Sequence, residues 1–186
     1  MNARSDILAL QRAQLQHDAA YHQDILVLDT ARRAKHMALH NAKYTGRFVA
    51  AVEDGDSELF GRTLTDAFII SVATANTFSQ DIGAELLPEF GECVSLQDLG
   101  ERLFHNRGNE SSFVREYAIH TGNMAKACES LDHLEDFPFR SQIVAANLGI
   151  FEAIVAEASV RRIDVTEAYS ERISEVESKS PRNFLL

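Results

Sequence analysis

The feature that most constrains this chain is the scarcity and placement of its helix breakers. Only three prolines occur in 186 residues, Pro88, Pro138 and Pro181, and the long stretches between them are rich in Ala, Leu, Glu, Arg and Gln. These residue types favour helix, whereas proline interrupts it. An apolar content of 45% is sufficient for a buried core in a chain of this length. The sequence therefore predicts an all-α fold, a helical bundle of about six to seven helices, in one domain comprising residues 1–186.

Apolar periodicity and capping residues predict where these helices lie. The expected helices span 5–21, 30–52, 57–79, 95–105, 111–135, 141–162 and 164–178, with a connecting loop at 88–94. The halves 1–105 and 110–186 share an outline, a long helix with an apolar–His pair, an acidic turn and a long apolar helix containing Ala-Asn. This outline fits two pseudo-repeated halves that meet near residues 106–109, and equally a chance likeness between helical hairpins.

Charge and cysteine content narrow the classes of partner. A formal net charge of −10 repels the phosphates of duplex nucleic acid and anionic lipid surfaces. Cys93 and Cys128 are too few for a disulfide framework, which favours a reducing compartment. The N-terminus does not resemble a secretory signal, and the longest uncharged window, 67–80, is shorter than a membrane-spanning helix requires. We therefore expect a cytoplasmic protein without a membrane segment or affinity for duplex nucleic acid.

A stripe of basic and imidazole side chains follows one face of the predicted helix 30–52. At 100° per residue, its members fall within about 80° of one another. They are Arg32, His36, His40, Lys43 and Arg47. The stripe suits an anion, and the candidate phosphate-binding residues are its members His36, His40, Lys43 and Arg47 together with Arg62 on the next helix. The alternative is a solvated face whose long side chains cover the core. The His36/His40 spacing also suits a metal, but the neighbouring cations disfavour one.

Asp66 lies inside a predicted helix that is apolar almost all the way round. A buried carboxylate requires a cation, hydrogen-bond donors or protonation, so it is either a functional acid or half of a structural ion pair, for instance with Arg62. A magnesium site gathers several oxygen ligands. We therefore predict a Mg²⁺ site formed by Asp66 with Glu53 and Asp56 from the acidic segment before this helix. The alternative is that this segment, which also contains Asp54 and Glu58, is merely solvated.

A second acidic set forms another candidate cation site. Glu129 and Asp132 have the i, i+3 spacing that places two carboxylates on one helix face. The alternative is that this short ExxD pattern arises by chance, because such patterns are common in acidic helical proteins.

Two segments then resemble a known family. LHNAKYTGRFVAAVEDGD at 39–56 and RTLTDAFIISVATANTFSQDIG at 62–83 are similar to the MazG-like, all-α nucleoside triphosphate pyrophosphohydrolases, and 162–177 is similar to the family's closing segment. The resemblance implies Mg²⁺-dependent conversion of an NTP or dNTP to NMP and pyrophosphate, a nucleotide ligand and a dimer or higher homo-oligomer. Asp66 matches the last metal-binding acid of the family pattern. Thr63 replaces another of its acids, and Lys43 and Arg47 lie where it has glutamates.

Two functions therefore remain open. The resemblance implies a MazG-like nucleotide pyrophosphohydrolase or a catalytically degenerate nucleotide-binding relative. The alternative is a non-enzymatic helical module for dimerisation or interaction, suggested by the segment 141–162, which is richer in large apolar side chains than one small core requires.

Overall fold

The computed structural model describes residues 2–106, 112–133 and 135–179, and within these ranges the chain is helical with no strand. The helices are α1 (Ala3–Tyr21), α2 (Gln23–Leu26), α3 (Thr30–Asp54), α4 (Ser57–Thr77), α5 (Ile82–Phe90), α6 (Leu96–Asn106), α7 (Phe113–Asp132), α8 (Phe139–Arg161) and α9 (Val165–Lys179). The predicted all-α bundle is confirmed. The boundary expected near residues 106–109 falls mostly outside the described residues.

Polar caps explain where several helices begin and end. Asn2 and Ser5 form a reciprocal capping box at the start of α1. Asp29 and Asp56 accept backbone hydrogen bonds at the starts of α3 and α4. Gly55 adopts a φ of 66°, which terminates α3 in the left-handed conformation that glycine tolerates best. The α3 and α4 hairpin is thus defined by local sequence.

Two short helices raise the count above the expected six to seven. α2 has four residues, and α5 occupies part of the segment predicted as a loop at 88–94. Pro88 lies in the last turn of α5, where its missing N–H removes a single intrahelical bond, and Gly91 follows at a φ of 68°. Ile82 and Leu86 are fully buried. Their burial stabilises a helix that the proline alone argues against.

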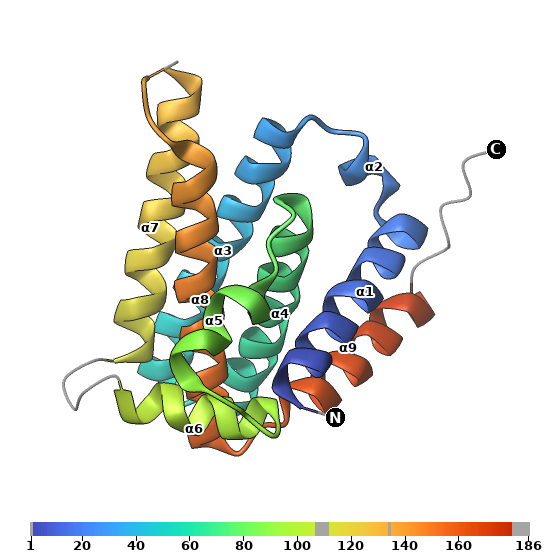
Figure 1. Ribbon diagram of the computed structural model, residues 1–186, viewed down its shortest axis with the longest axis vertical. Coiled ribbons are helices and arrows are strands. Elements are labelled where there is room, and N and C mark those ends of the chain that lie inside the picture. Colours follow the sequence, from blue (N-terminus) through green and yellow to red (C-terminus); the bar gives the residue numbers. More distant parts are fainter. Residues whose placement is uncertain (1, 107–111, 134, 180–186) are drawn as a thin grey trace.

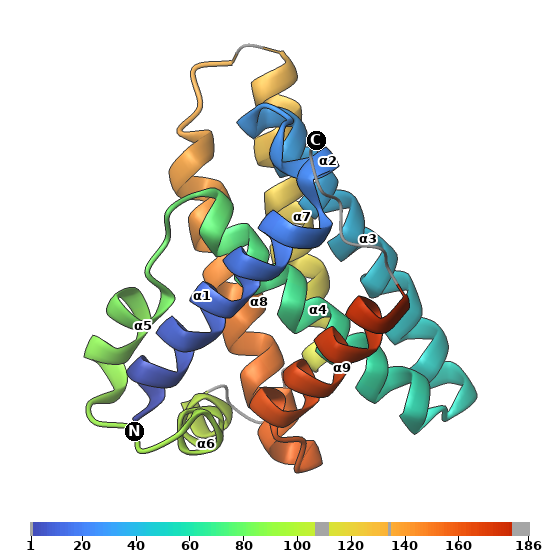
Figure 2. The ribbon, with the colours of Figure 1, turned by 90° about the vertical axis from the view of Figure 1, so that its right-hand side faces the viewer.

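Four long helices form a closed ring at the centre of the molecule. α3 contacts α4, α4 contacts α8, α8 contacts α7, and α7 returns to α3 (Figure 1). α1 and α9 lie side by side across α4, as the turned view makes clear (Figure 2), while α6 packs on α8. The ring is thus extended on one side by the first and last helices of the described chain.

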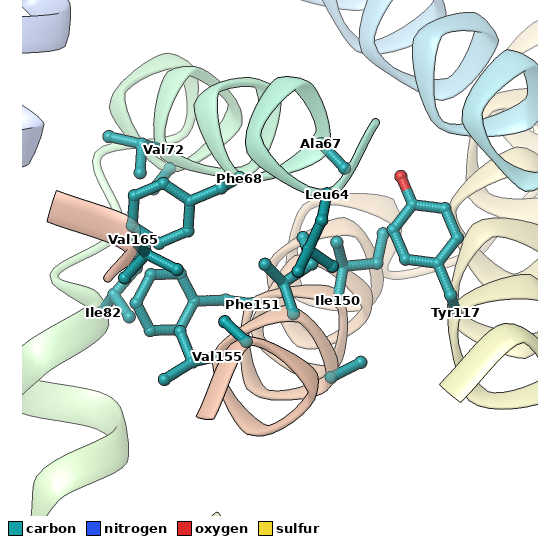
Figure 3. Packing of buried hydrophobic residues seen from close by; sticks show 14 of the residues in the cluster. Leu64, Ala67, Phe68, Val72, Ile82, Tyr117, Ile150, Phe151, Val155 and Val165 are labelled. Carbon is teal, nitrogen blue, oxygen red and sulfur yellow. The ribbon is translucent and has the colours of Figure 1, made fainter. Parts of the chain in front are cut away.

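The core is continuous from one end of the ring to the other. Figure 3 shows Phe68 of α4 against Phe151 of α8, with ring centroids 5.6 Å apart. At the α3–α7 contact, Tyr117 donates a 2.6 Å hydrogen bond to Asn41, and both residues are buried. This bond satisfies two polar groups that would otherwise destabilise the interior.

The apolar character of α8 is accounted for within a single chain. The helix is long and apolar enough to cross a membrane by length and composition, but 67% of its most apolar window is buried in the bundle. Ile143, Ile150 and Phe151 are at most 1% exposed. The surplus of large side chains at 141–162 therefore does not by itself indicate a second copy, and the homo-oligomer remains a prediction.

Candidate functional site

A cavity of about 380 Å³ lies between the α3–α4 pair and a wall formed by the end of α1, α2 and α9. Its permanently cationic lining residues are Arg33, Lys43, Arg47 and Arg172. Its histidines are His17, His22, His36 and His40, and its carboxylates are Asp18 and Asp66. We call this the cationic cavity. It carries an excess of permanent positive charge in a chain whose net charge is −10.

All four stripe residues that were predicted to bind phosphate line this cavity. His36, His40, Lys43 and Arg47 follow one another along the cavity-facing side of α3. Arg32 lies at the edge of the stripe, where it is exposed and paired with Asp29 outside the cavity.

Arg62 is also outside the cavity lining. It is exposed and paired with Glu58 one turn earlier on α4, at 2.5 Å. The structure therefore does not bring this arginine to the other predicted phosphate-binding residues.

The two histidines of the stripe interact with each other rather than with a carboxylate. The Nε2 atoms of His36 and His40 are 3.2 Å apart, and Nδ1 of His40 is 3.2 Å from the Lys43 ammonium. Burial, followed by the charge of Lys43, lowers the pKa of His40 from 6.5 to about 4. Burial also lowers the pKa of His36. At neutral pH the two rings are therefore neutral, and the positive charge of the stripe comes from its lysine and arginines.

We expect this histidine pair to make the fold less stable in acid. As pH falls from about 6.5 towards 4, the unfolded chain takes up a proton at His40 that the folded chain does not. The free energy of unfolding should therefore decrease by about 1–2 kcal/mol over this window, after allowance for partial exposure of the ring. Urea denaturation at several pH values measures this change in the free energy of unfolding. His40→Gln should flatten the dependence, whereas the exposed His105→Gln should retain it; equal slopes in all three proteins would contradict the assignment.

The carboxylate of Asp66 on α4 lies close to two arginines, one on α3 and one on α9. One carboxylate oxygen accepts a 2.7 Å bond from Nε of Arg172 on α9, and the other is 3.9 Å from a terminal nitrogen of Arg47. The Asp66 side chain is 13% exposed. Its bond with Arg172 is the main cause of that arginine's raised pKa. The carboxylate thus links α4 to α9 at the cavity wall, with different partners from the Arg62 considered above.

The other predicted acids lie elsewhere. Glu53 is exposed in the last turn of α3, Asp56 caps α4, and neither lines the cavity. On α7, Glu129 is paired with Lys126 at 3.1 Å, and Asp132 is paired with Lys35 of α3. Within the described residues, the acids predicted to bind Mg²⁺ are therefore not gathered around Asp66.

Several cavity residues were not predicted. Arg33 donates a 2.9 Å hydrogen bond to Thr77, and its buried Nε has no hydrogen-bond partner among the described residues. His17, Asp18 and His22 meet at the end of α1. The spacing His-Asp-x-x-x-His was a visible signal for metal-ligating residues.

Gln14, Tyr44 and Thr77 add polar groups to the lining, and its other residues are apolar. These include Ile25 and Leu26 of α2, Met37 of α3, and Ile69 and Ile70 of α4. A cavity that combines cations on α3 and α9 with apolar side chains on α2 and α4 is complementary to a ligand that carries both phosphate groups and an apolar organic group.

The chain was also compared with known proteins. No protein-family model, curated protein or solved structure matches it. The chemistry of the cavity is therefore the basis on which a function can be inferred.

Proposed function

We propose that the cationic cavity binds a nucleotide. The carrying observation is that Lys43, Arg47 and Arg172, from two helices far apart in sequence, converge on one cavity that has an apolar wall. In this arrangement the phosphates contact the cations and the base packs against Ile69 and Ile70. The volume of about 380 Å³ lies within the range of small-molecule sites.

Mutual repulsion among the cations supports an anionic ligand. Burial, and then the charge of Arg47, lowers the pKa of Lys43 from its ordinary value. Asp66 offsets only part of this positive charge. A phosphate at this position would accept charge-assisted hydrogen bonds from the lysine and the arginines, and would reduce the repulsion between them.

Of the two functions that the MazG-like resemblance implies, the arrangement favours the catalytically degenerate nucleotide-binding relative. Mg²⁺-dependent pyrophosphate release requires several carboxylates around the metal. Glu53 and Asp56 do not reach the cavity. Thr63, which stands where the family pattern has an acid, is buried and donates its hydroxyl hydrogen to Leu59 of its own helix at 2.7 Å.

Calorimetric titration with a panel of NTPs and dNTPs, with and without Mg²⁺, tests the proposal. We expect saturable binding that Lys43→Ala weakens by roughly tenfold, the equivalent of one charge-assisted hydrogen bond. Lys35→Ala is the matched control because Lys35 lies on the same helix and is paired with Asp132 outside the cavity. Absence of binding, or equal weakening by both substitutions, would contradict the proposal.

A parallel assay of pyrophosphate release separates binding from hydrolysis. The degenerate relative should bind nucleotide without turnover. Mg²⁺-dependent release of pyrophosphate that is abolished by Asp66→Ala would instead establish the pyrophosphohydrolase.

A further inference from the structure

The end of α1 places three metal-ligating side chains together. One ring nitrogen from each of His17 and His22 and one carboxylate oxygen of Asp18 all lie within 4.8 Å of one another. We propose that these side chains bind a divalent transition-metal ion of the Zn²⁺ class. All three line the cationic cavity, so an ion bound by them would be accessible from it. This proposal does not depend on nucleotide binding, because the affinity for the metal ion is measured in the absence of nucleotide.

The break between α1 and α2 creates this grouping. On a continuous helix, His22 would lie about 140° around the axis from His17. α1 instead ends at Tyr21, and His22 adopts a non-helical conformation with φ −127° and ψ 40°. Its ring then packs edge-on against the ring of His17, with centroids 5.2 Å apart. The end of α1 at Tyr21 therefore brings the ring of His22 next to His17 and Asp18.

Neighbouring side chains orient two of the three ligands. Nδ1 of His17 is 3.0 Å from a carboxylate oxygen of Glu177 on α9, which leaves Nε2 as the nitrogen for the metal. Gln14 donates a 2.7 Å bond to one oxygen of Asp18, leaving the other free, and Tyr169 donates to Gln14 at 3.0 Å. Metal-binding histidines typically have such a carboxylate partner on the second ring nitrogen. His17 is 5% exposed, so its ring is held by packing as well.

The local charges favour a metal that binds imidazole over one held by charge alone. Arg33 is close enough to influence Asp18 electrostatically. Its charge opposes every cation, and most of all Mg²⁺ or Ca²⁺, which depend on several anionic oxygens, whereas a Zn²⁺-class ion also bonds to neutral imidazole. Two histidines and one carboxylate are a ligand set used by Zn²⁺ and related ions with an open position. The last turn of α1 also lacks a basic residue, so the negative end of the helix dipole faces a cation without competition from its own helix.

The experiment uses the untagged full chain after removal of metals with a chelator. Titration with Co²⁺, followed by visible absorption, and with Zn²⁺, followed by calorimetry, should each show one ion per chain. We expect His22→Gln to weaken binding by at least about tenfold and Glu177→Gln to weaken it by about 10–100-fold through the orientation of His17. His105→Gln, at an exposed position on α6, should leave the affinity unchanged.

Three results would overturn the assignment. The first is the absence of stoichiometric binding, and the second is an unchanged affinity in His22→Gln. The third is loss of binding in His36→Gln but not in His22→Gln, which would place the ion on the neighbouring His36/His40 pair. Melting of each metal-free variant verifies folding. If His22→Gln does not fold, Glu177→Gln provides the same test from α9.

Discussion

Gly100→Ala should lower the free energy of unfolding by about 2–3 kcal/mol, the upper part of the range for overpacked interiors. Gly100 lies on α6 where it packs on α8, and an added Cβ would lie 2.5 Å from the backbone oxygen of Val155 and 2.8 Å from Cβ of Ser159. A backbone oxygen inside a helix cannot rotate away as a side chain can. The two helices must therefore move apart, and contacts along their shared face weaken.

Gly122→Ala is the matched control for this effect. Gly122 is exposed in the middle of α7, and nothing lies within 4 Å of its added Cβ. Alanine has the higher helix propensity, so this variant should be more stable than the wild type by about 0.5–1 kcal/mol. Chemical denaturation of both variants gives the comparison. A Gly100→Ala protein as stable as its control would show that the α6–α8 contact is looser than described.

Asp66→Asn should have opposite effects on stability and on anion binding. Asparagine can still offer an oxygen to Arg172 but removes the negative charge of its 2.7 Å partner, and the remaining carboxylate at Arg172 is the exposed Glu175 at 2.8 Å. We therefore expect the free energy of unfolding to fall by about 1–3 kcal/mol. The same change removes a negative charge from among the cavity cations. Nucleotide affinity should therefore increase by roughly fivefold.

The direction of the affinity change discriminates between two roles for Asp66. A carboxylate that holds Mg²⁺ for the nucleotide would give weaker binding in Asp66→Asn, and only when Mg²⁺ is present. A counter-ion to Arg172 and Arg47 gives stronger binding with or without Mg²⁺. Glu58→Gln is the control, since Glu58 forms an exposed pair with Arg62 outside the cavity, and both its stability and its affinity should stay close to wild type.

Local sequence predicted the long helices well because their apolar periodicity extends over many turns. The helix expected at 30–52 is Thr30–Asp54, and the one expected at 141–162 is Phe139–Arg161. α2 has too few residues for a period to be visible. α5 was not predicted because Pro88 indicates a loop when only the local sequence is considered. The helix forms because Leu86 is buried against the rest of the fold, which the local sequence does not reveal.

In the candidate site too, the groupings within one helix could be predicted from sequence, whereas contacts between distant helices could not. His36, His40 and Lys43 were grouped correctly because positions on one helix have fixed angular relations. Asp66 was expected in a largely apolar environment, but its partner Arg172 is 106 residues away. No periodicity in the chain specifies that α9 lies across α4, so this part of the cavity wall could not be derived without the tertiary packing.

The way α9 is attached has a consequence for entry into the cavity. Only Val165 and Tyr169 are buried on this helix, whereas α8 buries twelve residues. Its other contacts are mainly polar: Arg172 is paired with Asp66, Glu177 contacts His17, and Tyr169 donates a hydrogen bond to Gln14, while Ile173 packs partly buried against the core. Dissolved ions screen the charged Arg172–Asp66 pair but leave hydrophobic contacts intact. We therefore expect ionic strength to regulate how often this wall swings outward, with ligand exchange faster in concentrated salt while the four-helix ring stays closed.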